Sequence, residues 1–366
     1  MDPRTNQDGS ETISVLESHH RKVFSQALMN ILSSDVAEFT YAQILDGLPT
    51  VESMQESYVW MEGHPVYELD HSKLCDDFLE KAKEFRAQFD PLQLTFKKSL
   101  LDAFQHTIPG TKAFNLRLIE MVVVACHQIG AYLYDLDGGI HKHQLHQDWR
   151  DELYPQLGNG MHPDGYFLPH AAFFHISYQY PDQYPHGNAD VAGYWAEGKI
   201  FGGVVVFDRG ETDKECKEVW IHGASVDGPR TLYPPTAEQF NSLVAFLLAD
   251  TDSRGKTPLP LPIHGTAQNR PRWRAYEAFV DNHIFRDRYE RKMPAQRPEP
   301  TPPHRITGVD WPELEDDWYV LGQFQAGWQG LPVDEEGVLA AQERLRNITP
   351  SSPLWAAVFG GQEDGR

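Results

Sequence analysis

The stretch from Thr111 to Leu133 constrains the fold more than any other part of the sequence, because apolar residues occupy most of its helical circumference. Its centre, Met121 to Cys126, contains no polar residue. A helix that is apolar on nearly every side has to be buried on nearly every side, like a helix at the centre of a bundle. We therefore expect a long central helix that the rest of the chain surrounds.

Three polar residues interrupt this predicted helix, namely Glu120, His127 and Gln128. Glu120 and His127 are seven residues apart, which places them two turns apart on one face. A carboxylate or an imidazole that is buried without a partner costs several kcal/mol. We expect these two side chains to pair with each other in the core, or else to line a cavity.

Further helices follow from apolar residues at helical spacing. The clearest begins with a capping box, in which Thr236 caps the helix and Gln239 reaches back to it. The predicted helices cover residues 13–31, 74–89, 94–104, 236–247 and 273–289.

Two short strands are predicted downstream. Strand character begins at Tyr194, and the segment Ile200 to Phe207 is rich in β-branched and aromatic residues, as is Glu218 to His222. Residues 208–217 predict the hairpin connection between them. The fold class is therefore α+β, mainly helical with a small antiparallel β-sheet and a long ordered loop.

The expected organisation is a disordered tail, residues 1–12, followed by one compact domain, residues 13–366. We expect Trp311, Trp318 and Trp328 to pack onto its main core. In chain order the domain comprises a helical part (13–133), a His/Tyr-rich loop region (134–190), a β-hairpin plus helix (191–250) and a C-terminal helical wrap (251–366) with a Pro-rich connector (293–304).

The His/Tyr-rich loop region is the predicted location of the functional site. Seven of the chain's seventeen histidines lie between His141 and His186. Imidazole titrates near neutral pH and is the commonest metal ligand. The region is too long for an ordinary connector, and its many aromatic residues argue against disorder. The alternative is a purely structural loop that seals the core with amphipathic side chains.

A metal site is predicted at His141, His143, His146 and Asp148, whose spacing reads HxHxxH and HxD. On a strand the first two histidines share a face, and on a helix the second and third do, so either conformation aims two imidazoles at one point. Two histidines and a carboxylate form the facial triad of non-haem iron. The expected cofactor is a divalent metal, iron or zinc.

The HxD motif resembles that of the 2-oxoglutarate-dependent iron oxygenases. That resemblance implies His146, Asp148 and His222 as iron ligands, with Arg230, eight residues after His222, holding the co-substrate carboxylate. Those enzymes place HxD within a succession of strands, however, and residues 134–190 show almost no strand alternation. An iron oxygenase is therefore the alternative and not the first hypothesis.

The first hypothesis uses histidines as acid and base. His170, His175 and His222 could move protons near neutral pH if Asp190 or Glu197 tuned them. Aromatic neighbours suit a small hydrophobic organic substrate. An isomerase, cyclase, dehydratase or lyase would fit this arrangement.

Composition and missing motifs exclude other classes. A formal net charge of −21 disfavours nucleic acid and anionic membranes as partners. The sequence has no GxGxxG, no GxxxxGK[ST] and no GxSxG. The cysteines, Cys75, Cys126 and Cys216, form no CxxC pair and give no sign of a disulfide framework or a thiolate zinc site. No targeting segment is recognisable, so the expected location is the cytoplasm.

Three stretches together resemble a family of uncharacterised predicted proteins from filamentous fungi. They begin at Phe114 (FNLRLIEMVVVACHQIGAYLYDLDGGIHK), Asp182 (DQYPHGNADVAGYWAEGKIFGGVVVFDRG) and Phe285 (FRDRYERK). The resemblance implies an accessory enzyme of fungal secondary metabolism and assigns no catalytic residue. A non-catalytic binding or interaction protein remains the alternative.

Overall fold

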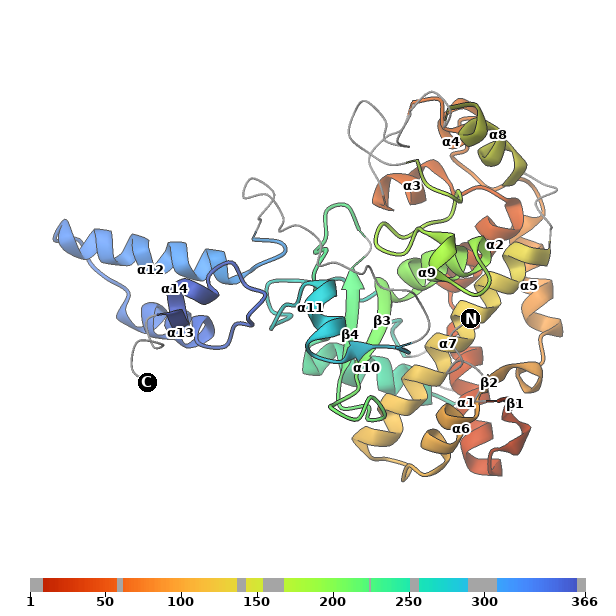
Figure 1. Ribbon diagram of the computed structural model, residues 1–366, viewed down its shortest axis with the longest axis horizontal. Helices are drawn as coiled ribbons and strands as arrows, with labels where there is room; N and C mark the ends of the chain where they lie inside the picture. Colours follow the sequence, from red (N-terminus) through yellow and green to blue (C-terminus); the bar gives the residue numbers. More distant parts are fainter. Residues whose placement is uncertain are drawn as a thin grey trace.

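The computed structural model describes residues 9–57, 62–136, 143–153, 168–223, 225–250, 257–288 and 308–360. It confirms an α+β fold that is mainly helical with small antiparallel sheets (Figure 1). The helices are α1 (Ser18–Leu32), α2 (Asp35–Asp46), α3 (Val51–Ser57), α4 (Pro65–Glu68), α5 (Phe78–Gln88), α6 (Lys98–Gln105), α7 (Lys112–Leu136), α8 (His143–Leu153), α9 (Asn188–Phe201), α10 (Ala237–Leu248), α11 (Ala275–Val280), α12 (Glu313–Trp328), α13 (Glu335–Leu345) and α14 (Trp355–Phe359). The strands are β1 (Ser10–Thr12), β2 (Thr95–Lys97), β3 (Gly203–Asp208), β4 (Val219–Gly223), β5 (Leu232–Tyr233) and β6 (Ile284–Phe285).

Helix α7 is the central helix that the sequence predicts. Its residues from Leu118 to Val123 are all buried, and α1, α2 and α9 pack against it (Figure 1). Its length would suit a membrane span, and so would the mean hydropathy of 1.4 over one window of 18 residues. However, 78% of that 18-residue window is buried within the protein. Packing in the core therefore accounts for its apolar character.

Helices α7 and α9 cross at unusually close range. Every residue of α9 except Asn188 and Lys199 is buried. A Cβ atom at Gly130 would lie 3.0 Å from the Cβ of Ala196, and one at Gly193 would lie 2.8 Å from Cε1 of His127. The crossing therefore depends on residues without a side chain at these two positions.

We expect Gly193→Ala to destabilise the fold by about 1–3 kcal/mol, the usual cost of overpacking a core. The His127 ring cannot swing aside, because hydrogen bonds hold both of its nitrogens. Gly322→Ala is the matched control: a Cβ there meets nothing within 4 Å in the exposed middle of α12. That change should stabilise the protein by about 0.5–1 kcal/mol. Urea unfolding measures both, and equal effects of the two substitutions would contradict the close crossing.

The larger sheet is antiparallel, with strand order β5-β4-β3-β6 and Val205 opposite Ile221. Both predicted strands are confirmed at their centres, and so is the capping box at Thr236 and Gln239. The predicted strand start at Tyr194 is wrong, because α9 continues to Phe201 and ends at Gly202 in a left-handed conformation. A helix buried on every side shows no amphipathic stripe, so its period is hidden from the sequence.

The predicted long loop is partly helical. Helix α7 extends to Leu136, α8 occupies His143–Leu153, and α9 begins at Asn188. Hydrogen bonds between side chains four residues apart support α8, from Gln144 to Asp148 and from Gln147 to Asp151, and its apolar residues Leu145, Trp149 and Leu153 recur at the same spacing. Residues 137–142 and 154–167 lie outside the described residues.

Both chain ends differ from expectation. Ser10–Thr12 pair with β2, so the predicted tail is ordered at its end, and residues 1–8 lie outside the described part. Helices α12 and α13 pack on each other and form a small cluster apart from the main core (Figure 1). Trp311 is buried as predicted, but Trp318 and Trp328 are 67% and 88% exposed.

Two further predictions fall in the C-terminal half. The predicted helix 273–289 divides into α11 and β6, joined through His283 with a φ of 54°. The Pro-rich connector 293–304 lies outside the described residues.

Candidate functional site

The predicted metal site at the start of α8 is not assembled by the described residues. His141 lies outside them, and His143 is the first residue of the helix. His146 is buried, with its ring 5.2 Å from that of His64 and 5.4 Å from that of Trp149. Asp148 is exposed and accepts a hydrogen bond from Gln144. Residues that are two positions apart point to opposite sides of a helix, so His146 and Asp148 cannot bind the same metal ion.

The oxygenase assignment also fails at His222, which lies on β4. Its Nε2 is 3.1 Å from the carbonyl oxygen of Arg230, and its Nδ1 is 3.2 Å from the hydroxyl of Tyr178. A carbonyl oxygen only accepts, so Nε2 donates to it, and Nδ1 shares a hydrogen bond with the Tyr178 hydroxyl. Arg230 itself is exposed, and its backbone N–H donates to Asp310. Both ring nitrogens of His222 therefore make hydrogen bonds within the protein.

Two of the three predicted acid–base histidines lie together, because the ring centroids of His175 and His222 are 5.5 Å apart. His175 donates from Nε2 to the carbonyl oxygen of His222 and accepts at Nδ1 from the backbone N–H of Ser177. His170 is half-buried and accepts a hydrogen bond from Arg150. Burial lowers the pKa of His170, and Arg150 lowers it further. Of these three histidines, His175 lines the cavity described below, and the two carboxylates that were predicted to tune them, Asp190 and Glu197, bind His127 instead.

The predicted carboxylates Asp190 and Glu197 hold a different histidine. Nδ1 of His127 is 2.8 Å from a Glu197 oxygen, and its Nε2 is 3.2 Å from an Asp190 oxygen. Because carboxylates accept at both nitrogens, His127 is an imidazolium. Burial and Arg286 lower its pKa, but the hydrogen bonds to Asp190 and Glu197 outweigh them, so that the pKa is raised overall.

This cluster is part of a larger buried ion network. Glu197 also pairs with Arg286, whose carbonyl oxygen accepts a hydrogen bond from Arg209. Glu120 pairs with Arg209 at 2.6 Å and with Arg117 at 2.7 Å. The predicted pairing of Glu120 with His127 is therefore wrong, because each finds oppositely charged partners on other elements. The network ties α7, α9 and the sheet together in the core.

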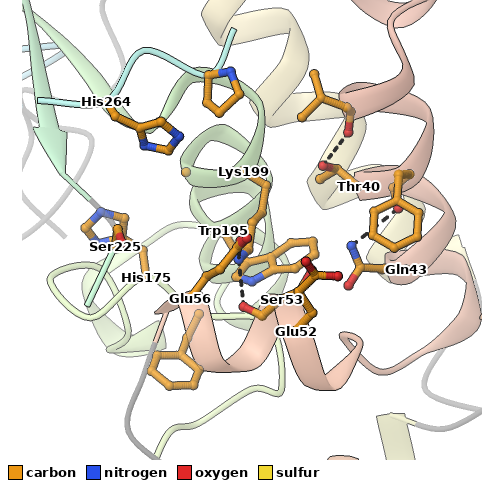
Figure 2. Close-up of a pocket in the computed structure, with 16 residues that line it drawn as sticks. Thr40, Gln43, Glu52, Ser53, Glu56, His175, Trp195, Lys199, Ser225 and His264 are labelled. Carbon is orange, nitrogen blue, oxygen red and sulfur yellow. Dashed lines mark hydrogen bonds and ion pairs between the residues drawn. The ribbon is translucent and has the colours of Figure 1, made fainter. Parts of the chain in front are cut away.

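A cavity of about 370 Å³ lies between α2, α3, α9 and the loops around residues 174, 225 and 263, as Figure 2 shows. Helix α9 contributes Trp195 and Lys199, and α3 contributes Glu52, Ser53 and Glu56. The remaining lining residues are Val36, Phe39, Thr40, Gln43, Phe174, His175, Gly198, Gly202, Ser225, Pro262 and His264. The volume lies within the range of small-molecule sites, and the walls combine aromatic rings with a few polar groups.

Lys199 is the cation of this cavity (Figure 2). Its side chain is only 12% exposed, and Nζ donates to the carbonyl oxygen of Ser53 at 2.6 Å and to Glu56 at 2.9 Å. Burial lowers its pKa below the usual 10.5, and Glu56 with Glu52 offsets part of that effect. An ammonium group has three N–H donors, so these two acceptors leave one for a ligand.

Hydrogen bonds to neighbouring segments fix the position of the two partners of Lys199, Ser53 and Glu56. Glu56 lies on α3, and its carbonyl oxygen accepts from Val226 in the loop after β4. Gln43 of α2 accepts from the backbone N–H of Thr50, whose hydroxyl caps α3 at Ser53. Sequence reasoning missed Lys199 because it lies where a strand was expected, although it is the one lysine or arginine in the mostly apolar segment 189–201.

Comparison with protein-family models, with curated proteins and with solved structures finds no match for this chain.

Proposed function

We propose that the protein binds a small hydrophobic organic molecule bearing a carbonyl oxygen in the cavity between α2, α3 and α9, and promotes proton transfer on it. The observation that carries this proposal is the ammonium group of Lys199, whose side chain is 12% exposed and which lines a cavity of about 370 Å³ together with Trp195 and Phe174. A largely buried lysine that lines a cavity and whose pKa is lowered by burial suits catalysis.

The chemistry follows from the two ionised groups. The Glu56 side chain is 60% exposed and stands 2.9 Å from Nζ of Lys199. In the proposed reaction, the Glu56 carboxylate takes a proton from the carbon beside the carbonyl group. Lys199 donates a hydrogen bond or a proton to the carbonyl oxygen, where negative charge develops. Return of the proton to another carbon gives an isomerase, and loss of a leaving group gives a lyase or dehydratase; an intramolecular attack gives a cyclase.

The cellular role in this proposal is that of a cytosolic accessory enzyme of fungal secondary metabolism. That part rests on the family resemblance alone. In this proposal, Lys199 and Glu56 take the roles that were predicted for His170, His175, His222, Asp190 and Glu197.

Ligand-observed NMR on the full chain tests the binding step. We expect hydrophobic ketones and carboxylic acids to bind and the matched hydrocarbons to bind more weakly, because only the former accept from Lys199. Ser225→Trp places a large ring at the cavity wall and should abolish binding. Gln325→Trp, on the exposed face of α12, should leave binding unchanged.

The outcomes separate the proposal from its alternative. Binding that survives Ser225→Trp would place the site elsewhere and refute the proposal. Binding without any turnover of the bound compounds would favour a non-catalytic binding protein and exclude the catalytic half of the proposal.

A further inference from the structure

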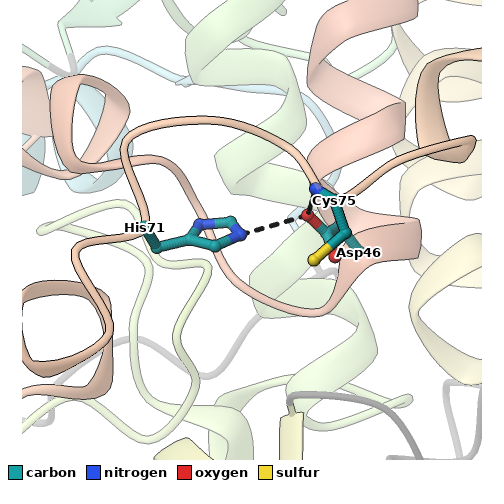
Figure 3. Close-up of side chains that lie close together, drawn as sticks. All are labelled: Asp46, His71 and Cys75. Atoms are coloured by element: carbon teal, nitrogen blue, oxygen red, sulfur yellow. Dashed lines mark hydrogen bonds and ion pairs between the residues drawn. The ribbon is translucent and has the colours of Figure 1, made fainter.

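Three potential metal ligands meet where α2 ends, as Figure 3 shows: Asp46, His71 and Cys75. One nitrogen of His71, one carboxylate oxygen of Asp46 and Sγ of Cys75 all lie within 4.8 Å of one another. Asp46 is fully buried and His71 is 6% exposed, whereas Cys75 is exposed. Zinc bound tetrahedrally to nitrogen, oxygen and sulfur would space these atoms about 3.3–3.8 Å apart.

The hydrogen bonds fix which nitrogen of His71 would bind. Its Nδ1 is 2.9 Å from the carbonyl oxygen of Pro49, which can only accept, so Nδ1 carries a proton. Its Nε2 faces Oδ2 of Asp46 at 3.1 Å. Two lone pairs repel at that distance, so a cation has to lie between them, either a second proton on His71 or a metal ion.

Three observations favour the metal ion. A ring N–H donated to a backbone carbonyl oxygen is the usual outer contact of a metal-binding histidine. The backbone N–H of Cys75 donates to Asp46 at 2.8 Å, which holds the cysteine beside the other two ligands. A thiolate supplies the soft ligand that zinc prefers, and a proton on His71 would not require it.

We propose that Asp46, His71 and Cys75 bind one Zn²⁺ ion, with the fourth position open to water. On binding, the thiol proton of Cys75 goes to solvent and Sγ forms the bond to the metal. Three protein ligands and an accessible fourth position are the arrangement of zinc sites that exchange ligands, whereas closed four-ligand sites are structural.

This site differs from the predicted one in every residue. The sequence indicates a metal among the histidines of residues 141–148, and the structure instead brings together the end of α2, which carries Asp46, and the segment between α4 and α5, which carries His71 and Cys75. The carbonyl oxygen of His71 also accepts from the backbone N–H of Val51, the first residue of α3. The ion would therefore fix the turn between α2 and α3.

Metal binding to full-length protein without a histidine tag tests the proposal. After a chelator has removed any metal, we expect the protein to bind one equivalent of Zn²⁺. Elemental mass spectrometry measures the amount of zinc bound. Co²⁺ should bind in its place and give a thiolate-to-cobalt charge-transfer band. Cys75→Ser should abolish that band and weaken Zn²⁺ binding at least about 100-fold, since loss of an outer contact alone costs 10–100-fold.

Cys216→Ser is the matched control. Burial raises the pKa of the Cys216 thiol to about 12, so it forms no thiolate at neutral pH. This variant should bind cobalt like the native protein. Because Cys75 is exposed, its replacement should leave the unfolding midpoint of the metal-free protein unchanged. Absence of stoichiometric binding, or a charge-transfer band that persists in Cys75→Ser, would overturn the proposal. The readout needs no ligand in the Lys199 cavity, so this result is independent of the proposed function.

Discussion

Replacing His127 by alanine should lower the free energy of unfolding by about 3–5 kcal/mol, because the change leaves Asp190 and Glu197 buried without the imidazolium between them. His283→Ala is the matched control, since His283 also pairs with an aspartate, Asp213, but both side chains are 31% exposed. An exposed pair contributes at most about 1 kcal/mol. Urea unfolding monitored by circular dichroism measures both variants.

The stability difference between the native protein and His127→Ala should depend on pH. The folded pKa of His127 is raised above its usual 6.5, so its contribution is complete below pH 6.5 and is lost as pH rises through the folded value. Asp190 acts at the other end. Its burial raises its pKa, but His127 outweighs this and lowers it, so its contribution is present above the usual 3.8 and is lost as pH falls through the folded value. A difference that grows as the solution is made alkaline would show that His127 is neutral in the fold.

Lys199→Met should lower kcat about 10²–10⁴-fold for any compound that the binding experiment identifies as a substrate. The methionine keeps the length and the apolar stem of the side chain but cannot donate to the developing negative charge. Glu56→Gln should lower kcat similarly, because an amide accepts no proton. Lys97→Met is the control: Lys97 pairs with Asp287 at 2.6 Å but does not line the cavity.

The kinetic constants distinguish catalysis from binding. A residue that acts in the transition state lowers kcat and kcat/KM together, whereas one that only holds the substrate raises KM alone. We expect the first pattern for Glu56→Gln and both effects for Lys199→Met. A kcat that is unchanged in both variants would show that neither group transfers a proton.

The central part of the fold was predictable from the sequence, because a segment that is apolar on nearly every side of a helix has to be buried. Helix α7 and the capped helix α10 follow from apolar residues and from the Thr236–Gln239 pair. Helix α9 was not predictable in this way. Its apolar residues lie on all sides of the helix and show no helical period, so the sequence resembles the start of a strand. Helix α8 was missed although Leu145, Trp149 and Leu153 recur every four residues in the sequence, and its polar side chains also pair at that spacing.

The site depends on contacts between distant segments, which spacing along the chain does not show. His127 meets its carboxylates 63 and 70 residues further on, and Lys199 meets Glu56 143 residues back. The residue types were informative, because histidine and acid residues do form the buried cluster. The HxD spacing was misleading, because two residues that are two positions apart on a helix, such as His146 and Asp148, point to opposite sides of it.

The close approach of Gly193 to the His127 ring couples the two positions. A side chain at 193 is harmful only while the imidazole fills that space, so the substitutions Gly193→Ala and His127→Ala together should cost less than the sum of their separate effects. In evolutionary terms, each position sets the mutations that the other tolerates. A related chain with a side chain at position 193 should carry a small residue at 127 and should have lost the charge balance around Asp190 and Glu197 as well.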